Sequence, residues 1–414
     1  MMAPVQLKPG VWWVGAIDWN ERNFHGYTTN RGSTYNAYLI VDEKITLIDG
    51  VKRGFEKELI GRISQIVDPS KIDYIISNHT EMDHSSGIPA VLKLAPQAKV
   101  VTAAPKGIEH FKAHFGDMAE FIGVKSGETL NIGKRTLSFI HTPMVHWPES
   151  MATYSDLDKI AFTMDAFGQH FASSMRFDDE VEMAEVMAQA KKYYANIVMP
   201  FAPQVVKVMD ALAPFEIDMI APSHGVVWRS YVNEIMKSYN KWSHNKLSEY
   251  AVVVYDSMWH STEDMASQIT DAFMELGVPA RLFDLKVNHI SDIITETLDA
   301  RYVAVGSSTL NNNLMPTVAS FLTYLKGLTP RNRHAIGIPF GSYGWSGQSV
   351  GQVAEALKEC QLELAFGEYK QKWVPTEDDL NALREDLMNK VKELQAEKGC
   401  LPKLSKITQI EYEA

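Results

Sequence analysis

A cluster of potential metal ligands stands directly after a run of apolar residues, and it constrains the fold more than any other feature of the sequence. The run IDYIIS (72 to 77) has the composition of a buried strand, and His79, Glu81, Asp83 and His84 follow it closely. In an extended segment His79, Glu81 and Asp83 point to one side, and a bend can turn His84 toward them. The alternative is a polar loop whose carboxylates cap the next helix. Such a concentration of ligand groups instead predicts a metal site at a strand's carboxyl end.

Three further candidates each follow a β-type run later in the chain: His146 in HTPMVHWPES, Asp165 in IAFTMDAFG and His224 in IDMIAPSHG. Each alone is explained as well by an ordinary loop or turn residue, but their shared position after strands favours one site. With only Cys360 and Cys400, the chain can build neither a disulfide framework nor a four-cysteine iron site, so the metal must be held by His and carboxylates. We expect ordinary packing or surface roles for the remaining loop and helix histidines considered, His110, His114, His141 and His170.

The 414 residues exceed the usual size of one domain, and the pattern changes near residue 249. Before it, short apolar runs alternate with turns and helical patterns, which predicts a layered α/β domain over 1–248. After it, strands and helices alternate regularly, which predicts a doubly wound parallel sheet over 249–400. Residues 401–414 show little periodicity and are expected to form a loosely held tail.

The charge balance narrows the choice of partners. Lys and Arg number 40 against 51 Asp and Glu, a net charge of −11, which disfavours nucleic acid or an anionic membrane surface as the main partner. No apolar stretch approaches the roughly 20 residues of a membrane span, and the first residues, MMAPVQLKPG, lack a basic and apolar leader. We therefore expect a cytoplasmic protein.

Three loops at strand ends in the second half predict a flavin site. The first follows AVVVY (251 to 255) and opens a helix, where hydroxyl groups, backbone N–H groups and the helix dipole suit a phosphate. Taken alone, its Ser and Thr residues are explained as well by helix capping. Together with SSTLNNNL (307 to 314) and GSYGWSGQ (341 to 348), it resembles the FMN-binding loops of flavodoxins.

The expected roles differ among these loops. Ser257, Ser261 and Thr262 are the expected phosphate contacts, and Trp259 and Trp345 are expected to flank the flavin ring. His260 stands where short flavodoxins tend to have Gly. The remaining expected contacts are Met258, Ser308, Thr309, Leu310, Asn311, Asn312, Ser342, Tyr343, Gly344, Ser346 and Gly347.

The metal segment resembles that of the metallo-β-lactamase fold, whose loop reads His-x-His-x-Asp-His. This resemblance implies an αββα sandwich for the first domain. Here Glu81 replaces the second histidine, and a carboxylate adds negative charge and a harder oxygen ligand, which favours iron or manganese over zinc. The change points to a redox centre.

The complete pattern resembles the flavodiiron family (A-type flavoproteins, similar to rubredoxin:oxygen oxidoreductase) in its two-domain form, over nearly the whole chain. The resemblance implies that His79, Glu81 and His146 bind one iron, that Asp83, His84 and His224 bind the second, and that Asp165 bridges them. In some members the histidine at the position of His84 lies off the metal. His25 and Tyr194 are expected to be catalytic pocket residues beside the second iron.

The resemblance also implies the activity and the partners. Di-iron and FMN would together reduce O2 to water, NO to N2O, or both. Rubredoxin is the expected electron donor, since the sequence holds no C-x-x-C pairs of its own. A head-to-tail homodimer is expected. The alternatives are a zinc hydrolase of the metallo-β-lactamase type joined to a flavodoxin domain, and a non-enzymatic FMN electron carrier.

Overall fold

The computed structural model describes residues 3–330 and 333–397, so the tail predicted at 401–414 lies outside the described residues. The chain forms two compact units, and each is described by itself. The first extends to Lys246 and includes 328–330, and the second holds the other described residues from Leu247 on. Among the described residues, the structure has no helix that is long and apolar enough to span a membrane.

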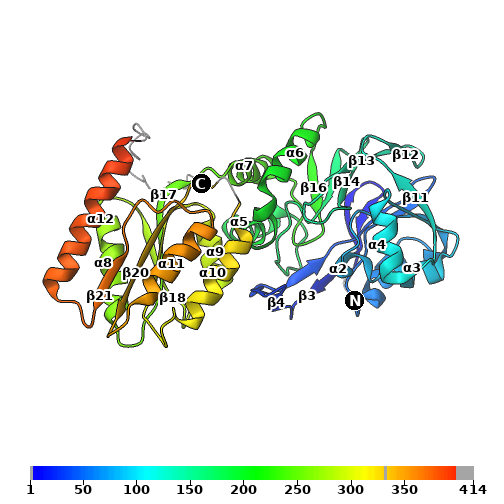
Figure 1. Ribbon diagram of the computed structural model, residues 1–414. Helices are drawn as coiled ribbons and strands as arrows, with labels where there is room; N and C mark the ends of the chain where they lie inside the picture. Colours follow the sequence, from blue (N-terminus) through cyan, green and yellow to red (C-terminus); the bar gives the residue numbers. More distant parts are fainter. Residues whose placement is uncertain (1–2, 331–332, 398–414) are drawn as a thin grey trace. The chain divides into compact units, whose positions relative to one another are not determined.

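The first unit is built on two sheets (Figure 1). The larger sheet has the order β1-β2-β7-β8-β9-β10-β11, antiparallel from β1 to β8 and parallel from β8 to β11. Its strands are β1 (Val5–Lys8), β2 (Val11–Trp13), β7 (Tyr38–Ile40), β8 (Ile45–Ile48), β9 (Ile72–Ser77), β10 (Lys99–Ala103) and β11 (Glu120–Val124). Two short ribbons pair β3 (Ala16–Asp18) with β6 (Ser33–Tyr35) and β4 (Asn23–Phe24) with β5 (Tyr27–Thr28).

The smaller sheet has the order β12-β13-β14-β15-β16, and only its last pair is parallel. Its strands are β12 (Thr129–Asn131), β13 (Thr136–His141), β14 (Met151–Ser155), β15 (Ile160–Met164) and β16 (Met219–Pro222). The helices of this unit are α1 (Glu56–Ile63), α2 (Met82–Ser85), α3 (Ile88–Leu94), α4 (Lys106–Phe115), α5 (Met183–Tyr193), α6 (Ala202–Leu212) and α7 (Val232–Ser243).

Two apolar clusters define the layers of the first unit. Between the sheets, side chains such as Ile76 and Val101 pack against Phe139 and Phe162. On the other face of the larger sheet, alternate residues of the same strands, such as Ile75, pack against α1, α3 and α4. Burial on both faces explains why these strands read as continuous apolar runs. The predicted αββα sandwich is confirmed.

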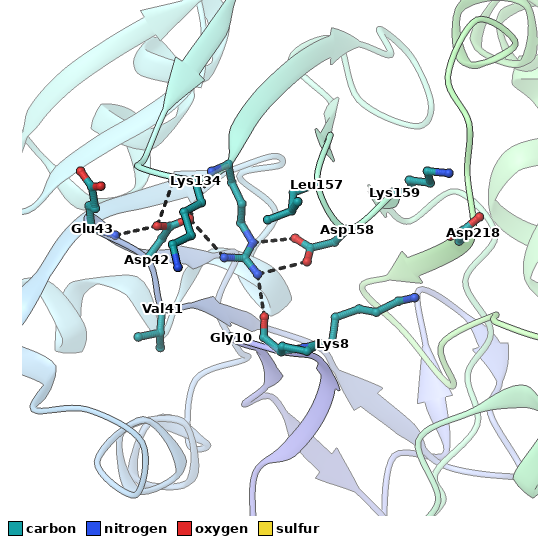
Figure 2. Close-up of a pocket in the computed structure, with 12 residues that line it drawn as sticks. Lys8, Gly10, Val41, Asp42, Glu43, Lys134, Leu157, Asp158, Lys159 and Asp218 are labelled. Atoms are coloured by element: carbon teal, nitrogen blue, oxygen red, sulfur yellow. Dashed lines mark hydrogen bonds and ion pairs between the residues drawn. The ribbon is translucent and has the colours of Figure 1, made fainter.

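A buried ion cluster ties the turns of the two sheets together (Figure 2). Arg135, between β12 and β13, donates from Nε and Nη2 to Asp158 at 2.7 and 3.1 Å and from Nη1 to Asp42 at 3.1 Å. Asp42 belongs to the turn between β7 and β8, and Asp158 to the turn between β14 and β15. The cluster lines an open pocket at the ends of the strands away from the predicted ligands, and Arg135 pairs with both of its carboxylates. We assign it a structural role.

The second unit is a five-stranded parallel sheet in the order β18-β17-β19-β20-β21. Its strands are β17 (Ser248–Asp256), β18 (Ala280–Asp284), β19 (Ala300–Ser307), β20 (Ile336–Tyr343) and β21 (Tyr369–Lys372), and its helices are α8 (Ser261–Glu275), α9 (Ile290–Thr297), α10 (Pro316–Leu328), α11 (Gln348–Glu359) and α12 (Glu377–Glu397). Helices α8 and α12 share a core with one face of the sheet, and Figure 1 shows α9, α10 and α11 on the other face. This order is the flavodoxin-like one, as predicted, and it places the switch point between β17 and β19.

Candidate metal centre and flavin pocket

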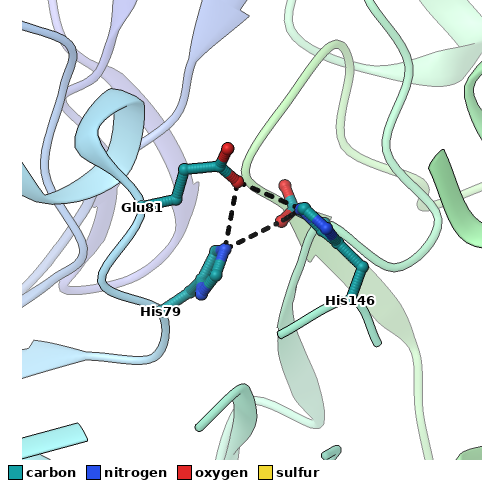
Figure 3. Close-up of side chains that lie close together, drawn as sticks. His79, Glu81 and His146 are labelled. Carbon is teal, nitrogen blue, oxygen red and sulfur yellow. Dashed lines mark hydrogen bonds and ion pairs between the residues drawn. The ribbon is translucent and has the colours of Figure 1, made fainter. Parts of the chain in front are cut away.

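One group of potential ligands comes from three strand ends of the first unit. His79 and Glu81 follow β9, His146 follows β13 and Asp165 follows β15. The Nε2 atoms of His79 and His146 lie 3.2 and 3.0 Å from Glu81 Oε2. They lie 3.6 and 3.2 Å from Asp165 Oδ2. Figure 3 shows His79, Glu81 and His146 pointing toward one another, and all four residues offer an atom within 4.8 Å of the others.

A second group adjoins the first. Asp83 and His84 lie in the short helix α2, and His224 follows β16. The Nε2 atom of His84 is 3.3 Å from Asp83 Oδ1, and that of His224 is 3.2 Å from Asp83 Oδ2. These three residues also offer atoms within 4.8 Å of one another. The histidine predicted as a possible non-ligand, His84, therefore faces this group in the structure.

Asp165 connects the two groups. While its Oδ2 faces the histidines of the first, its Oδ1 lies 3.1 Å from Nε2 of His84 and 3.5 Å from Nε2 of His224. One buried carboxylate thus offers an oxygen to each group. This is the arrangement that two metal ions sharing a bridging carboxylate require.

Several atoms of these groups are buried without a hydrogen-bond partner among the described residues. They include both carboxylate oxygens of Asp83, Nε2 of His84 and Nε2 of His224. An unsatisfied buried polar atom costs roughly 1–3 kcal/mol, and more when it is charged, so convergence of several on one point favours the binding of a ligand. Metal ions bound by these nitrogen and oxygen atoms would satisfy all of them.

The pKa values of the histidines reflect this crowding of charge. Burial lowers the pKa of His146, but the carboxylates of Asp165 and Glu81 outweigh burial and raise it to about 10. For His84, burial likewise opposes the carboxylates of Asp83 and Asp165, which raise the pKa to about 10. Without metal, protons on these rings neutralise the carboxylates.

Of the two predicted pocket residues, His25 reaches the site and Tyr194 does not. Nε2 of His25 lies 2.7 Å from Glu81 Oε1. It therefore contacts the first ligand group, whereas the sequence analysis placed it beside the second iron. Tyr194 packs against Tyr239 and Trp242. Its neighbour Tyr193, at the end of α5, lies with its ring centroid 5.8 Å from that of His224. Adjacent helical residues point about 100° apart, and the sequence does not show which tyrosine faces the site.

The histidines that were expected to be ordinary divide into two kinds. His114 contacts Phe115, and His141 lies 3.0 Å from the carbonyl oxygen of Val124. His170 instead packs beside the site, with its ring centroid 4.5 Å from that of His224. Burial, and then the proximity of His224, lowers the pKa of His170 well below its usual value, so it is neutral. His110 also approaches the site and is considered below.

In the second unit, the three predicted loops line one cavity of about 620 Å³ at the carboxyl ends of β17, β19 and β20. The predicted residues that line it are Met258, Trp259, Ser261, Ser308, Thr309, Asn311, Asn312, Ser342, Tyr343, Gly344, Trp345 and Ser346. Trp373 and Val374 also line it. They follow β21, a mostly polar edge strand that the sequence analysis did not recognise.

Five predicted contacts lie off the cavity surface. Thr262 is buried beneath it and binds the hydroxyls of Ser308 and Ser342 at 3.0 and 2.7 Å, which links the three loops. His260 has a φ of 69° and points out to Glu263, at 2.7 Å. The other three predicted contacts that do not line the cavity are Ser257, Leu310 and Gly347.

The cavity has the features of a flavin phosphate and ring site. The hydroxyl of Ser261 stands at the N-terminus of the 15-residue helix α8, where backbone N–H groups and the helix dipole attract an anion. Trp259 and Trp345 are each 85% exposed beside the cavity, available for stacking on a flat ligand. These residues fit FMN.

Comparison with known proteins identifies the family. Residues 34–225 match the model described as ODP family beta lactamase, and residues 253–388 match the Flavodoxin model. The chain is 44% identical to a nitric oxide reductase of Moorella thermoacetica over 386 residues, covering 92% of this chain and 96% of that protein. It is 41% identical to the rubredoxin-oxygen oxidoreductase of Megalodesulfovibrio gigas, covering 92% and 96%.

A solved structure agrees with these relatives. The flavodiiron protein of Giardia intestinalis superposes with a TM-score of 0.92 at 36% identity, covering 96% of this chain and 98% of that one. The two units therefore define a protein that joins a metallo-β-lactamase-like domain to a flavodoxin domain. The chain belongs to the flavodiiron family, and the resemblance seen in its motifs is confirmed.

The raised pKa values of His84 and His146 predict that metal uptake releases protons. Both rings are protonated at neutral pH without metal, and a metal ion can bind only the neutral ring. Affinity should rise with pH, by about tenfold per unit for each displaced proton, until the pH approaches 10. Calorimetric titration of metal-depleted protein with Co²⁺ in two buffers of different protonation enthalpy measures the protons released. His114→Ala should release as many as the parent protein, and pH-independent affinity without proton release would contradict the prediction.

Proposed function

We propose that this protein reduces O2 to water, NO to N2O, or both, at a di-iron centre supplied with electrons by FMN. The observation that carries the proposal is the position of Asp165, which offers one oxygen to each of two adjacent ligand groups. A flavin-type cavity in the same chain supplies the second half of the machinery. The relatives named above are a nitric oxide reductase and an oxygen oxidoreductase, which supports both substrates.

The ligand chemistry favours iron over zinc. His79, Glu81 and His146 would hold one ion, Asp83, His84 and His224 the other, and Asp165 both. Glu81, Asp83 and Asp165 supply three carboxylates, and these hard, anionic ligands suit a metal that must be stable in both its ferrous and its ferric states. A hydrolytic zinc site has no need of that additional charge.

FMN, when bound, accepts electrons in pairs and can pass them on singly. The protein's own residues hold and shape the two sites. His25 donates to Glu81 from a half-exposed position, so it can hold that carboxylate in place at the edge of the site. Burial, and then the nearby carboxylate of Asp165, raises the pKa of Tyr193 well above its usual value, so its hydroxyl keeps its proton beside the site.

Rubredoxin is the donor that we propose, because one relative is named a rubredoxin-oxygen oxidoreductase. We also propose a head-to-tail homodimer, which in this family sets the flavin of one chain beside the irons of another. Trp259, Trp345 and Trp373 support it, since all three are exposed around the flavin cavity and form an apolar surface that a second chain can cover. Sedimentation of the FMN-loaded, iron-loaded protein should show a dimer, and a fully active monomer would exclude this arrangement.

Replacement of the bridging residue tests the function. Asp165→Ala should lower gas consumption by roughly a hundredfold or more, because the shared oxygen ligands of both ions are lost, whereas FMN content should not change. Oxygen and nitric oxide electrodes measure consumption, and absorbance measures the flavin. Asp178→Asn is a matched control, since Asp178 is an equally buried carboxylate that accepts from the backbone N–H of Tyr231 at 2.7 Å. Unchanged gas reduction by Asp165→Ala would exclude the proposal.

A further inference from the structure

A buried carboxylate lies directly behind the first ligand group. Glu149, in the loop between β13 and β14, is 2% exposed, and its Oε1 is 2.7 Å from Nδ1 of His79. The same oxygen accepts from the backbone N–H of Thr80 at 3.2 Å and from its hydroxyl at 2.8 Å. Two donors of Thr80 thus converge on the carboxylate oxygen that also contacts His79.

The contact between Glu149 and His79 determines which nitrogen of His79 can bind a metal. Oε1 of Glu149 already accepts from both donors of Thr80, so Nδ1 of His79 contacts an acceptor and carries the proton. Nε2 of His79 is then free of its proton when a metal binds, and it is this nitrogen that faces Glu81 and Asp165. Glu149 therefore holds the ring in the tautomer and orientation that the first metal position needs.

In the second ligand group, the acceptor behind His224 is neutral. Nδ1 of His224 lies 2.6 Å from the backbone carbonyl oxygen of Thr34, a neutral acceptor. A carboxylate acceptor increases the electron donation of an imidazole to its metal more than a carbonyl does. The two metal positions thus differ in the group behind one of their histidines.

The second oxygen of Glu149 is buried and faces another histidine. Oε2 lies 3.2 Å from Nδ1 of His110 on α4, whose side chain is 31% exposed. The ring of Trp147 is close to both histidines, with its centroid 4.9 Å from that of His79 and 6.3 Å from that of His110. His110, expected from the sequence to be ordinary, thus completes the surroundings of this carboxylate.

We propose that Glu149 is a positioning residue for the metal held by His79, Glu81 and His146, and that its charge makes this ion the harder of the two to reduce. The positioning role of Glu149 follows from its contact with His79, whereas its effect on the reduction of the iron rests on the proposed di-iron function. The negative charge, transmitted through the His79 ring, stabilises the ferric over the ferrous ion at this position. His25 contacts the same group through a different ligand, Glu81.

Two substitutions of Glu149 separate the effect of its hydrogen bond to His79 from the effect of its negative charge. Glu149→Gln keeps an oxygen that can accept from His79 but removes the charge, whereas Glu149→Ala removes both. Glu149→Ala should weaken Co²⁺ binding to metal-depleted protein by roughly 10- to 100-fold, and Glu149→Gln by less. In the iron-loaded protein, Glu149→Gln should shift the reduction equilibrium of the iron pair toward the ferrous state by about tenfold, which corresponds to ~59 mV for one electron.

The FMN of the same protein is the internal reference, and its potential should not move. Asp178→Asn controls for the general loss of a buried carboxylate, and it should leave both Co²⁺ affinity and the iron potential unchanged. The proposal is overturned if both Glu149 variants keep the parent affinity and potential, or if Asp178→Asn has the same effects as Glu149→Ala. Because Co²⁺ affinity involves no gas chemistry, a protein that reduces neither O2 nor NO would exclude the proposed function and still leave the positioning role of Glu149 open to this test.

Discussion

The mutual repulsion of buried carboxylates is the constraint on which the rest of the site depends. Glu81, Asp83 and Asp165 lie close together, and each is less than 10% exposed. A fourth buried carboxylate, Glu149, contacts His79 from behind. Like charges so placed are strongly destabilising unless cations balance them. Protonated histidines provide part of that balance without metal, and two divalent ions provide it with metal. The folded site is therefore most stable when it is loaded.

The fold places these carboxylates and histidines close together because strand ends from two sheets converge at the site. Loops after β9, β13, β15 and β16 each contribute one or more ligands, so no single segment holds the metals. The packed apolar layer between the sheets fixes the spacing of these loops. The ion cluster around Arg135 joins turns of the two sheets at strand ends that carry no ligand. In the second unit, the hydroxyl of Thr262 performs a similar task by linking the flavin loops.

The sequence predicted the site best where ligand-type residues follow a recognisable strand. The seven predicted ligands stand directly after apolar runs, and the structure brings them together. Among these ligands, Glu81 distinguishes a redox site from a hydrolytic one by its residue type alone. Contacts that depend on the direction of a side chain, or on segments without a regular hydrophobic pattern, could not be predicted from the sequence. The choice between Tyr193 and Tyr194 depends on helix phase, Trp373 follows a polar edge strand, and Glu149 and His110 meet through folding alone.

The most direct measurement is gas consumption by protein whose iron and FMN have been quantified. The protein is reduced without oxygen, and limiting O2 and limiting NO are then added in separate experiments. The account predicts rapid consumption of at least one gas, with reoxidation of the flavin and the irons in the same reaction, and loss of this consumption when zinc replaces iron. A zinc-loaded protein with undiminished activity, or an iron-loaded and flavin-loaded protein that consumes neither gas, would contradict it.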